Sequence, residues 1–253
     1  MKNTIYSAVA ALMVMSASAA HAVTITYDYA MPSDGSGKTS QLAGTGNQST
    51  GNVFVETFDR ADGTGGQTLS PSQLTITPIS GGGFGYAQGS LDGVYAAPAG
   101  DSTHFAYGPN MGSGSSSAEV NFNYAGLLST LGTNASLNYF GLYYGSIDTF
   151  NDVTFYNAQG GVIQTVTGTD LITRFNGVSG DQSADSSNIY VNLFFRPEEQ
   201  FTSFSFTTTS PAFEVDNLVV GYQVTNPVPE PASLALLGLG FAGLGLARSR
   251  NKK

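Results

Sequence analysis

Apolar and polar residues alternate in short runs along most of the chain, and turn residues separate the runs. In residues 118–124 the apolar positions Val120, Phe122 and Tyr124 are separated by single polar residues. This period of two predicts a β-strand with one buried face. Residues 137–144 are instead almost continuously apolar and aromatic, which favours a central strand covered on both faces.

Other parts of the chain also consist of short apolar runs separated by turn residues. Similar runs predict further strands at residues 23–30, 52–58, 152–157, 162–167, 189–195, 201–207 and 212–222. Residues 127–131 and 170–175 are predicted as single helical turns, and no long amphipathic helix precedes residue 225. Residues 33–51 are rich in Gly, Ser and Thr and poor in apolar side chains, so we expect a flexible loop there. The fold class is therefore all-β, and the strand spacing favours an antiparallel two-sheet β-sandwich of jelly-roll type.

The last predicted strand changes phase at Asp216 and Asn217. Phe213 and Val215 have one parity, whereas the next apolar residue, Leu218, has the other. An extra residue in the strand restores the alternation, so the pattern predicts a β-bulge at this pair.

The N-terminus has the layout of a secretory signal peptide. A short positive region at Lys2 precedes an apolar run, and Ala20 and Ala22 then form the small-x-small cleavage pattern. We expect a cleaved signal over residues 1–22, with Val23 as the new N-terminus.

Three consecutive parts make up the C-terminus: the motif Pro229-Glu230-Pro231, an apolar stretch over residues 232–247, and a basic tail over residues 248–253 that contains Arg248 and Arg250. As a helix the apolar stretch is about 24 Å long, close to the ~30 Å hydrocarbon core of a bilayer. We therefore predict a transmembrane helix whose basic end stays in the cytoplasm. The prolines keep the preceding motif extended and accessible to a processing enzyme.

This arrangement resembles the PEP-CTERM sorting signal of exosortase-dependent proteins in Gram-negative bacteria. The resemblance implies three regions, a signal peptide at 1–22, an ectodomain at 23–224 and a sorting signal at 225–253. It implies an inner-membrane-anchored precursor that the partner exosortase cleaves, and then a location at the cell surface or in the extracellular matrix. Two segments within the ectodomain, residues 139–151 and 212–220, also resemble a group of exosortase-dependent surface proteins.

Charge and composition narrow the possible partners. Four of the nine basic and seventeen of the eighteen acidic residues lie in residues 23–228, so the net charge of this part is −13. Such a field repels nucleic acid and suits divalent cations or neutral glycans. The chain has no cysteine, which excludes disulfides and thiol catalysis.

A structural Ca²⁺ is one role open to the acidic residues. By analogy with jelly-roll modules, Glu56 or Asp59 from an early strand would meet Asp216 from the last strand and supply oxygen ligands. The alternative is that Asp216 and Asn217 only hydrogen-bond to nearby backbone at the strand irregularity.

A glycan-binding surface is the second role considered. Tyr143 and Tyr144 point to opposite faces of their strand, so one of them could lie on the surface, where it can stack on a sugar. The alternative, which we favour, is that these tyrosines pack in an aromatic core. Asp148, in the turn that follows, is either a turn residue or a ligand-facing one.

Catalysis has little support in the sequence. His104 is the one histidine left after processing, and its surroundings have no nucleophile-elbow pattern. We therefore predict a non-catalytic surface or matrix protein associated with exopolysaccharide or biofilm. The alternatives are a carbohydrate-binding module and a glycan hydrolase, which would need two carboxylates about 5–10 Å apart in a cleft.

Overall fold

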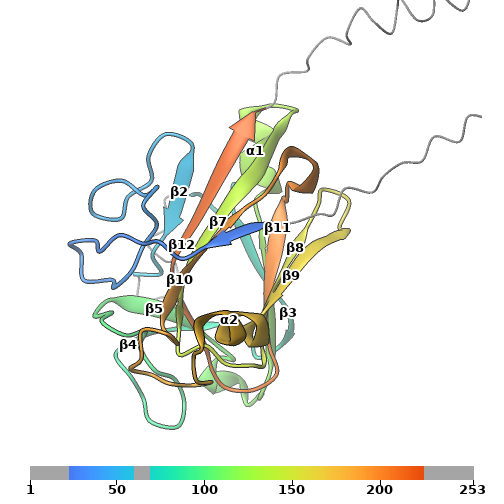
Figure 1. Cartoon of the computed structure of the whole chain (residues 1–253). Helices are drawn as coiled ribbons and strands as arrows, with labels where there is room; N and C mark the ends of the chain where they lie inside the picture. Colours follow the sequence, from blue (N-terminus) through green and yellow to red (C-terminus); the bar gives the residue numbers. More distant parts are fainter. Residues whose placement is uncertain (1–22, 60–68, 225–253) are drawn as a thin grey trace, which may run out of the picture.

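The computed structural model describes residues 23–59 and 69–224, and Figure 1 shows them as two antiparallel sheets that face each other. The predicted all-β sandwich is confirmed. The predicted signal peptide and transmembrane helix lie outside the described residues, and within the described ranges no helix is long and apolar enough to cross a membrane.

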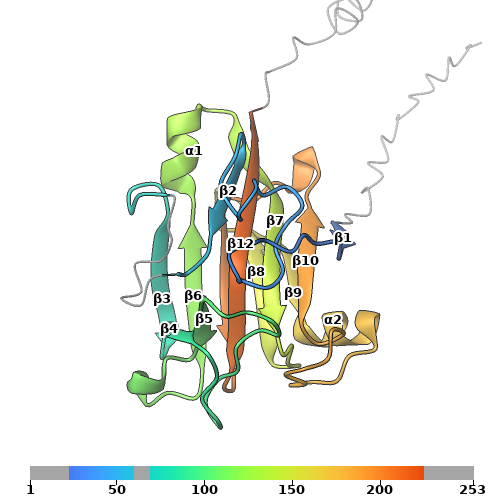
Figure 2. The same cartoon turned by 90° about the vertical axis from the view of Figure 1, so that its left-hand side faces the viewer.

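The larger sheet has seven strands with β12 (Phe213–Val224) near its centre (Figure 2). On one side the order continues through β7 (Ala135–Gly145), β10 (Ile189–Phe194) and β1 (Thr24–Thr26). On the other side β12 pairs first with β5 (His104–Gly108), which is followed by β4 (Gly85–Gln88), and then with β2 (Val53–Glu56). The central strand thus changes partner along its length.

The smaller sheet has five strands in the order β3 (Thr75–Gly81), β6 (Ala118–Asn123), β11 (Ser203–Thr208), β8 (Asn151–Tyr156) and β9 (Val162–Thr167). Two short helices, α1 (Ala125–Leu131) and α2 (Gly168–Phe175), lie at opposite ends of the sandwich (Figure 1). Two single 3₁₀ turns occupy Met111–Ser113 and Pro197–Glu199.

Phenylalanines fill the space between the sheets. Phe140 from the larger sheet meets Phe155 and Phe204 from the smaller one, with ring centroids 4.9 Å apart in both pairs. Phe122 stacks on Phe204 at 5.1 Å. All four side chains are buried, so truncating any of them to Ala would cost about 3–5 kcal/mol. Every second side chain of these strands points to the inner face of its sheet, and the apolar residues at these positions form the core.

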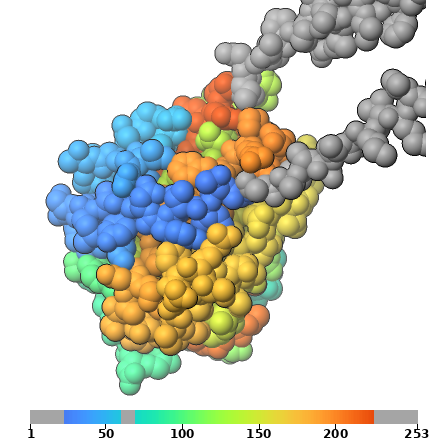
Figure 3. Space-filling model, viewed as in Figure 1, coloured from blue at the N-terminus to red at the C-terminus, as the bar shows by residue number. Residues whose placement is uncertain are grey.

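The larger sheet is also covered on its outer face, as the continuous apolar run in β7 predicts. A second apolar cluster on this face contains Val53, Val55, Tyr139, Tyr143, Tyr190 and Val219. Residues 33–51 lie over it, with Ser40 and Ala43 in contact with the cluster, and Figure 3 shows this part of the chain in blue on the surface. The predicted flexible loop is therefore wrong, because Ser36, Lys38 and Asn47 in this segment are buried.

The bulge predicted in β12 is confirmed. The register with β7 shifts between Asp216 and Val219, and Asn217 has a φ of 47°. Val215 and Leu218 therefore both face the core between the sheets.

Three strands, β3, β4 and β5, were not predicted. β3 is exposed along most of its length and contains Pro78, which a strand at the edge of a sheet tolerates. β4 and β5 have only four and five residues, and each includes a terminal glycine, so neither is long enough to show a clear run of alternating residues.

Candidate functional site

A polar pocket opens at the end of the larger sheet where β7 and β12 lie side by side. Its volume is about 230 Å³. Ser146 and Asp148 come from the turn after β7, Glu214 from β12, and Tyr95 and Gln182 from two loops. The antiparallel pairing of Glu214 with Gly145 places the two acidic side chains at one opening.

Glu214 is the buried acid of this pocket, with 3% of its surface exposed. Its Oε1 accepts a hydrogen bond of 2.8 Å from Ala96 N, and its Oε2 accepts one of 3.0 Å from Ser146 Oγ. Burial raises the pKa of Glu214 to about 7, although both hydrogen bonds favour the ionised form. The side chain therefore changes charge near neutral pH.

Asp148 is the more exposed acid. Its Oδ1 accepts a hydrogen bond of 2.7 Å from Ser179 Oγ, and partial burial raises its pKa. Ser146, two residues earlier, has a φ of 36°, which is strained for a residue with a side chain. Ser146 N donates to Asn188 Oδ1 at 3.0 Å, and this bond together with the one to Glu214 maintains the turn.

Neither tyrosine considered for glycan stacking has an exposed ring. Tyr144 lies in the core between the sheets, with its ring centroid 4.8 Å from that of Phe213. Tyr143 lies on the opposite face, as its parity predicts, but Lys38 and the rest of the N-terminal segment cover it. Both rings are buried, so the structure supports aromatic packing and not the surface alternative. The hydroxyl of Tyr143 donates to Ala99 O.

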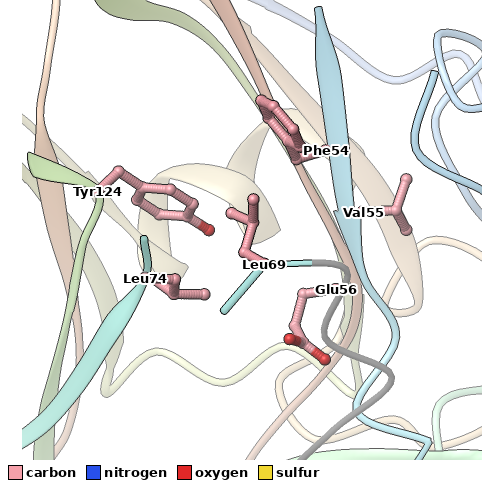
Figure 4. A pocket seen from close by; sticks show the side chains of 6 residues that line it. All are labelled: Phe54, Val55, Glu56, Leu69, Leu74 and Tyr124. Carbon is pink, nitrogen blue, oxygen red and sulfur yellow. The ribbon is translucent and has the colours of Figure 1, made fainter. Parts of the chain in front are cut away.

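Glu56 does not meet Asp216. It pairs in register with Leu218 and therefore faces the interior of the sandwich, whereas Asp216 faces outward. Figure 4 shows Phe54 and Glu56 on one side of β2 and Val55 on the other. The cavity beside Glu56 has a volume of only about 10 Å³, which is roughly the space of one water molecule.

Asp59 does lie near Asp216, together with Asp101, which the sequence did not single out. The Asp101 and Asp216 carboxyl groups are within hydrogen-bonding reach of each other, and each affects the pKa of the other. Burial and the charges of Asp101 and Asp59 raise the pKa of Asp216 well above its usual range. The sequence around Asp101 gives no sign of this contact, because Asp59 and Asp216 lie far from Asp101 along the chain.

In residues 23–59 and 69–224, no three His, Asp or Glu side chains form a group that could hold a metal ion. His104 is the first residue of β5, and its backbone N–H donates to Asp59 Oδ1 at 3.3 Å. The predicted sorting residues (Pro229, Glu230, Pro231, Arg248, Arg250) and the cleavage-pattern residues Ala20 and Ala22 lie outside the described residues.

Three solved structures are similar to this chain at low identity. The first is the enzymatically active domain of tailspike protein 4 of bacteriophage CBA120, with 14% identity and a TM-score of 0.31 over 62% of this chain and 20% of that chain. The second is a fucose-binding module, SpX-3, of Streptococcus pneumoniae, with 12% identity and a TM-score of 0.26 over 63% of this chain and 100% of that chain. The third is a Stig cyclase of Fischerella sp. TAU, with 11% identity and a TM-score of 0.29 over 69% of this chain and 86% of that chain. The chain thus spans a fifth of the length of the tailspike chain. No curated protein matches it.

One family model matches the C-terminus. Residues 227–251 match the PEP-CTERM protein-sorting motif, which includes the Pro229-Glu230-Pro231 segment, most of the basic tail and the apolar stretch between them. This match confirms the predicted sorting signal. The chain thus carries a PEP-CTERM protein-sorting motif at its C-terminus, and the motif implies an exported protein that is sorted through an exosortase.

Proposed function

We propose that this protein is a non-catalytic component of the cell surface or extracellular matrix that binds exopolysaccharide through the pocket of Ser146, Asp148, Gln182 and Glu214. The observation that carries the proposal is this pocket, built from hydrogen-bonding side chains in a protein whose sorting motif implies export. An exosortase would deliver it, and cleavage near the sorting motif would release it from the inner membrane.

The chemistry of the pocket suits a neutral sugar. Asp148 and Glu214 offer oxygens that accept hydrogen bonds from sugar hydroxyls, and the Gln182 amide both donates and accepts. The ring of Tyr95, at the rim, is the kind of surface on which a sugar can pack. The acidic field of the domain disfavours a polyanionic glycan, so we expect a neutral one.

Hydrolysis is the second candidate, because two carboxylates share the pocket and a pKa near 7 suits a general acid. Against it, both Glu214 oxygens already accept hydrogen bonds within the protein. Because both oxygens are already hydrogen-bonded, the carboxyl group is better placed to stabilise the turn at Ser146 than to donate a proton to a leaving group. The geometry therefore favours binding.

The test is co-sedimentation of the purified full-length protein with the exopolysaccharide of its native host. We expect saturable binding that Asp148→Asn and Gln182→Ala each weaken about tenfold, equivalent to about 1.4 kcal/mol. Glu119→Gln, on β6 of the other sheet, removes a charge that does not line the pocket and should bind like the wild type.

Reducing ends are counted in the same samples. Their steady release by the wild type, abolished in Asp148→Asn, would replace the proposal with hydrolysis. The absence of saturable binding by the wild type would refute the assignment of the pocket.

A further inference from the structure

A groove with a volume of about 450 Å³ lies on the outer face of the larger sheet. The polar pocket described above lies beside the paired residues Glu214 and Gly145 of β12 and β7. The groove lies beside the pair Gly221 and Tyr139 of the same two strands. Residues 139 and 145 of one strand are about 20 Å apart, so the groove and the pocket are separate features of the sheet.

A glycine forms the floor of the groove. Along β12, Val219 faces outward and Val220 faces the core, so Gly221 faces outward but has no side chain there. Tyr139 of β7 and Val53 of β2 pair with Gly221 from its two sides, and both are buried. The outer face is therefore hollow at a place where any other residue would fill it.

Two apolar side chains stand at the rim of this hollow. Leu42 belongs to the segment 33–51 that covers the outer face, and Phe194 is the last residue of β10. Their exposed fractions are 45% and 39%. The Phe194 ring packs against the ring of Tyr139, with centroids 5.1 Å apart, so it is fixed in place and still partly open to solvent.

Two amide side chains also line the groove. The register of β7 with β12 shifts between Gly221 and Tyr222, which leaves Asn138 at a bulge that re-aims its side chain. A Cβ atom on Gly221 would lie 3.7 Å from Asn138 Oδ1, so this oxygen faces the floor of the groove. Asn138 Nδ2 donates to Gln223 Oε1 at 3.1 Å, and Asn52 Nδ2 donates to Tyr222 O at 2.8 Å. These bonds fix both amides and leave each with further capacity to donate and accept.

The lining of the groove favours one class of occupant. None of the described residues that line it is acidic or basic, so an ion would find no opposite charge there. Leu42 and Phe194 are its two exposed large apolar side chains, far fewer than a stable protein interface of about 1,200–2,000 Å² needs. A neutral sugar matches an exposed ring flanked by amides, because its apolar face packs on the ring while its hydroxyl groups bond to the amides.

We propose that this groove is a second binding site for a neutral glycan, in which a sugar ring packs on Phe194 and sugar hydroxyl groups hydrogen-bond to Asn52 and Asn138. Its volume lies within the range of about 300–1,000 Å³ that is usual for ligand sites. The site rests on the proposed function for its ligand, an extracellular polysaccharide, but shares no residue with the polar pocket.

The test is co-sedimentation of the full-length protein with the exopolysaccharide of its native host, in the wild type and in Asp148→Asn, which weakens the polar pocket. In both backgrounds, Phe194→Ala and Asn138→Ala should each weaken binding about tenfold. The effects should combine additively with that of Asp148→Asn, because the two sites are far apart. Ile79→Ala is the matched control, since it removes an exposed apolar side chain from β3 of the other sheet and should bind like the wild type.

Phe194→Leu separates stacking from packing. It keeps an apolar side chain against Tyr139 but lacks the ring, so it should fold like the wild type and still bind about as weakly as Phe194→Ala. It also decides the question if Phe194→Ala does not fold.

The outcomes separate this site from the polar pocket. Wild-type binding by Phe194→Leu and Asn138→Ala, with weaker binding by Asp148→Asn, would overturn the groove and leave the pocket. The reverse pattern would support the groove and refute the pocket, and the absence of saturable binding by the wild type would refute both. A dimer in gel filtration that Phe194→Leu converts to a monomer would assign the groove to a second copy of the chain and overturn the proposal.

Discussion

Asn217 Nδ2 donates a hydrogen bond of 2.8 Å to Ser36 O, joining two residues that are 181 positions apart in the chain. The same amide group also donates to Ser36 Oγ and to Lys38 O, each at 2.9 Å. Asn217 Oδ1 in turn accepts from Asn47 Nδ2. One side chain at the bulge of β12 therefore fixes the N-terminal segment over the outer face of the larger sheet.

Asn217→Ala should destabilise the protein by about 3 kcal/mol. It removes a set of buried hydrogen bonds and leaves carbonyl groups without donors. Asn217 also has a positive φ, so Asn217→Gly should be less destabilising than Asn217→Ala, by about 1 kcal/mol. Urea denaturation measures both values.

Asn176 is the matched control for this comparison. It has a φ of 51° at the end of α2, but its side chain is exposed. Asn176→Ala should cost only about 1 kcal/mol. Equal effects at positions 176 and 217 would show that the buried hydrogen bonds contribute little.

Gly37→Ala should be more destabilising than Gly46→Ala. Both glycines have a φ above 70°. A Cβ at Gly37 would lie 2.6 Å from Tyr143 Cε1, whereas one at Gly46 would have no atom within 4 Å. We expect about 1 kcal/mol for Gly46→Ala and about 3 kcal/mol for Gly37→Ala. Urea denaturation of the two variants checks the difference, and equal losses would mean that the segment moves away from Tyr143 at little cost.

The alternation of apolar and polar residues predicted those strands whose side chains are buried on one face and exposed on the other. The change of parity between Val215 and Leu218 is visible in the sequence, so the bulge was predictable before its neighbours were known. The strands with clear alternation were predictable for the same reason. The strand β3 was not, because exposed positions carry no hydrophobic pattern.

The covering of the outer face was not predictable. The polar composition of residues 33–51 indicates a solvated loop unless the partner of Ser36 and Lys38 is known, and that partner is Asn217, far along the chain. The place of Tyr143 stayed undecided between core and surface for the same reason, because its parity was visible in the sequence but the segment that covers it was not. Asp101 was missed because only the folded chain brings it to Asp216.

Glu214→Gln should flatten the dependence of stability on pH. The folded-state pKa of Glu214 is about 7, whereas the ordinary pKa of a glutamate is 4.5, so the folded protein binds this proton more tightly than the unfolded chain does. The resulting stabilisation is complete below pH 4.5 and is lost as the pH rises to about 7. The wild type should therefore lose about 3 kcal/mol more than Glu214→Gln between pH 4.5 and pH 8.

Urea denaturation in EDTA at several pH values measures this difference. The remaining slope of Glu214→Gln should be negative too, since the pKa values of Asp101, Asp148 and Asp216 are also raised. Glu119→Gln should follow the wild-type curve. Parallel curves for Glu214→Gln and the wild type would mean that Glu214 is not protonated more readily in the folded state.

Replacement of Pro229, Glu230 and Pro231 by Ala should block processing and leave folding unchanged. The match to the sorting motif includes these residues, and the described ectodomain ends before them. In the native host, intact mass spectrometry should find wild-type protein that begins at Val23 and ends near the motif. The triple variant should retain its C-terminus through Lys253 and stay in the inner-membrane fraction. A control replacement of Thr225 and Asn226 by Ala, just before the matched residues 227–251, should be processed like the wild type. If the motif variant is cleaved normally, the motif is not what the processing enzyme recognises, and retention of Lys253 in the wild type would mean that the chain is a membrane-anchored protein.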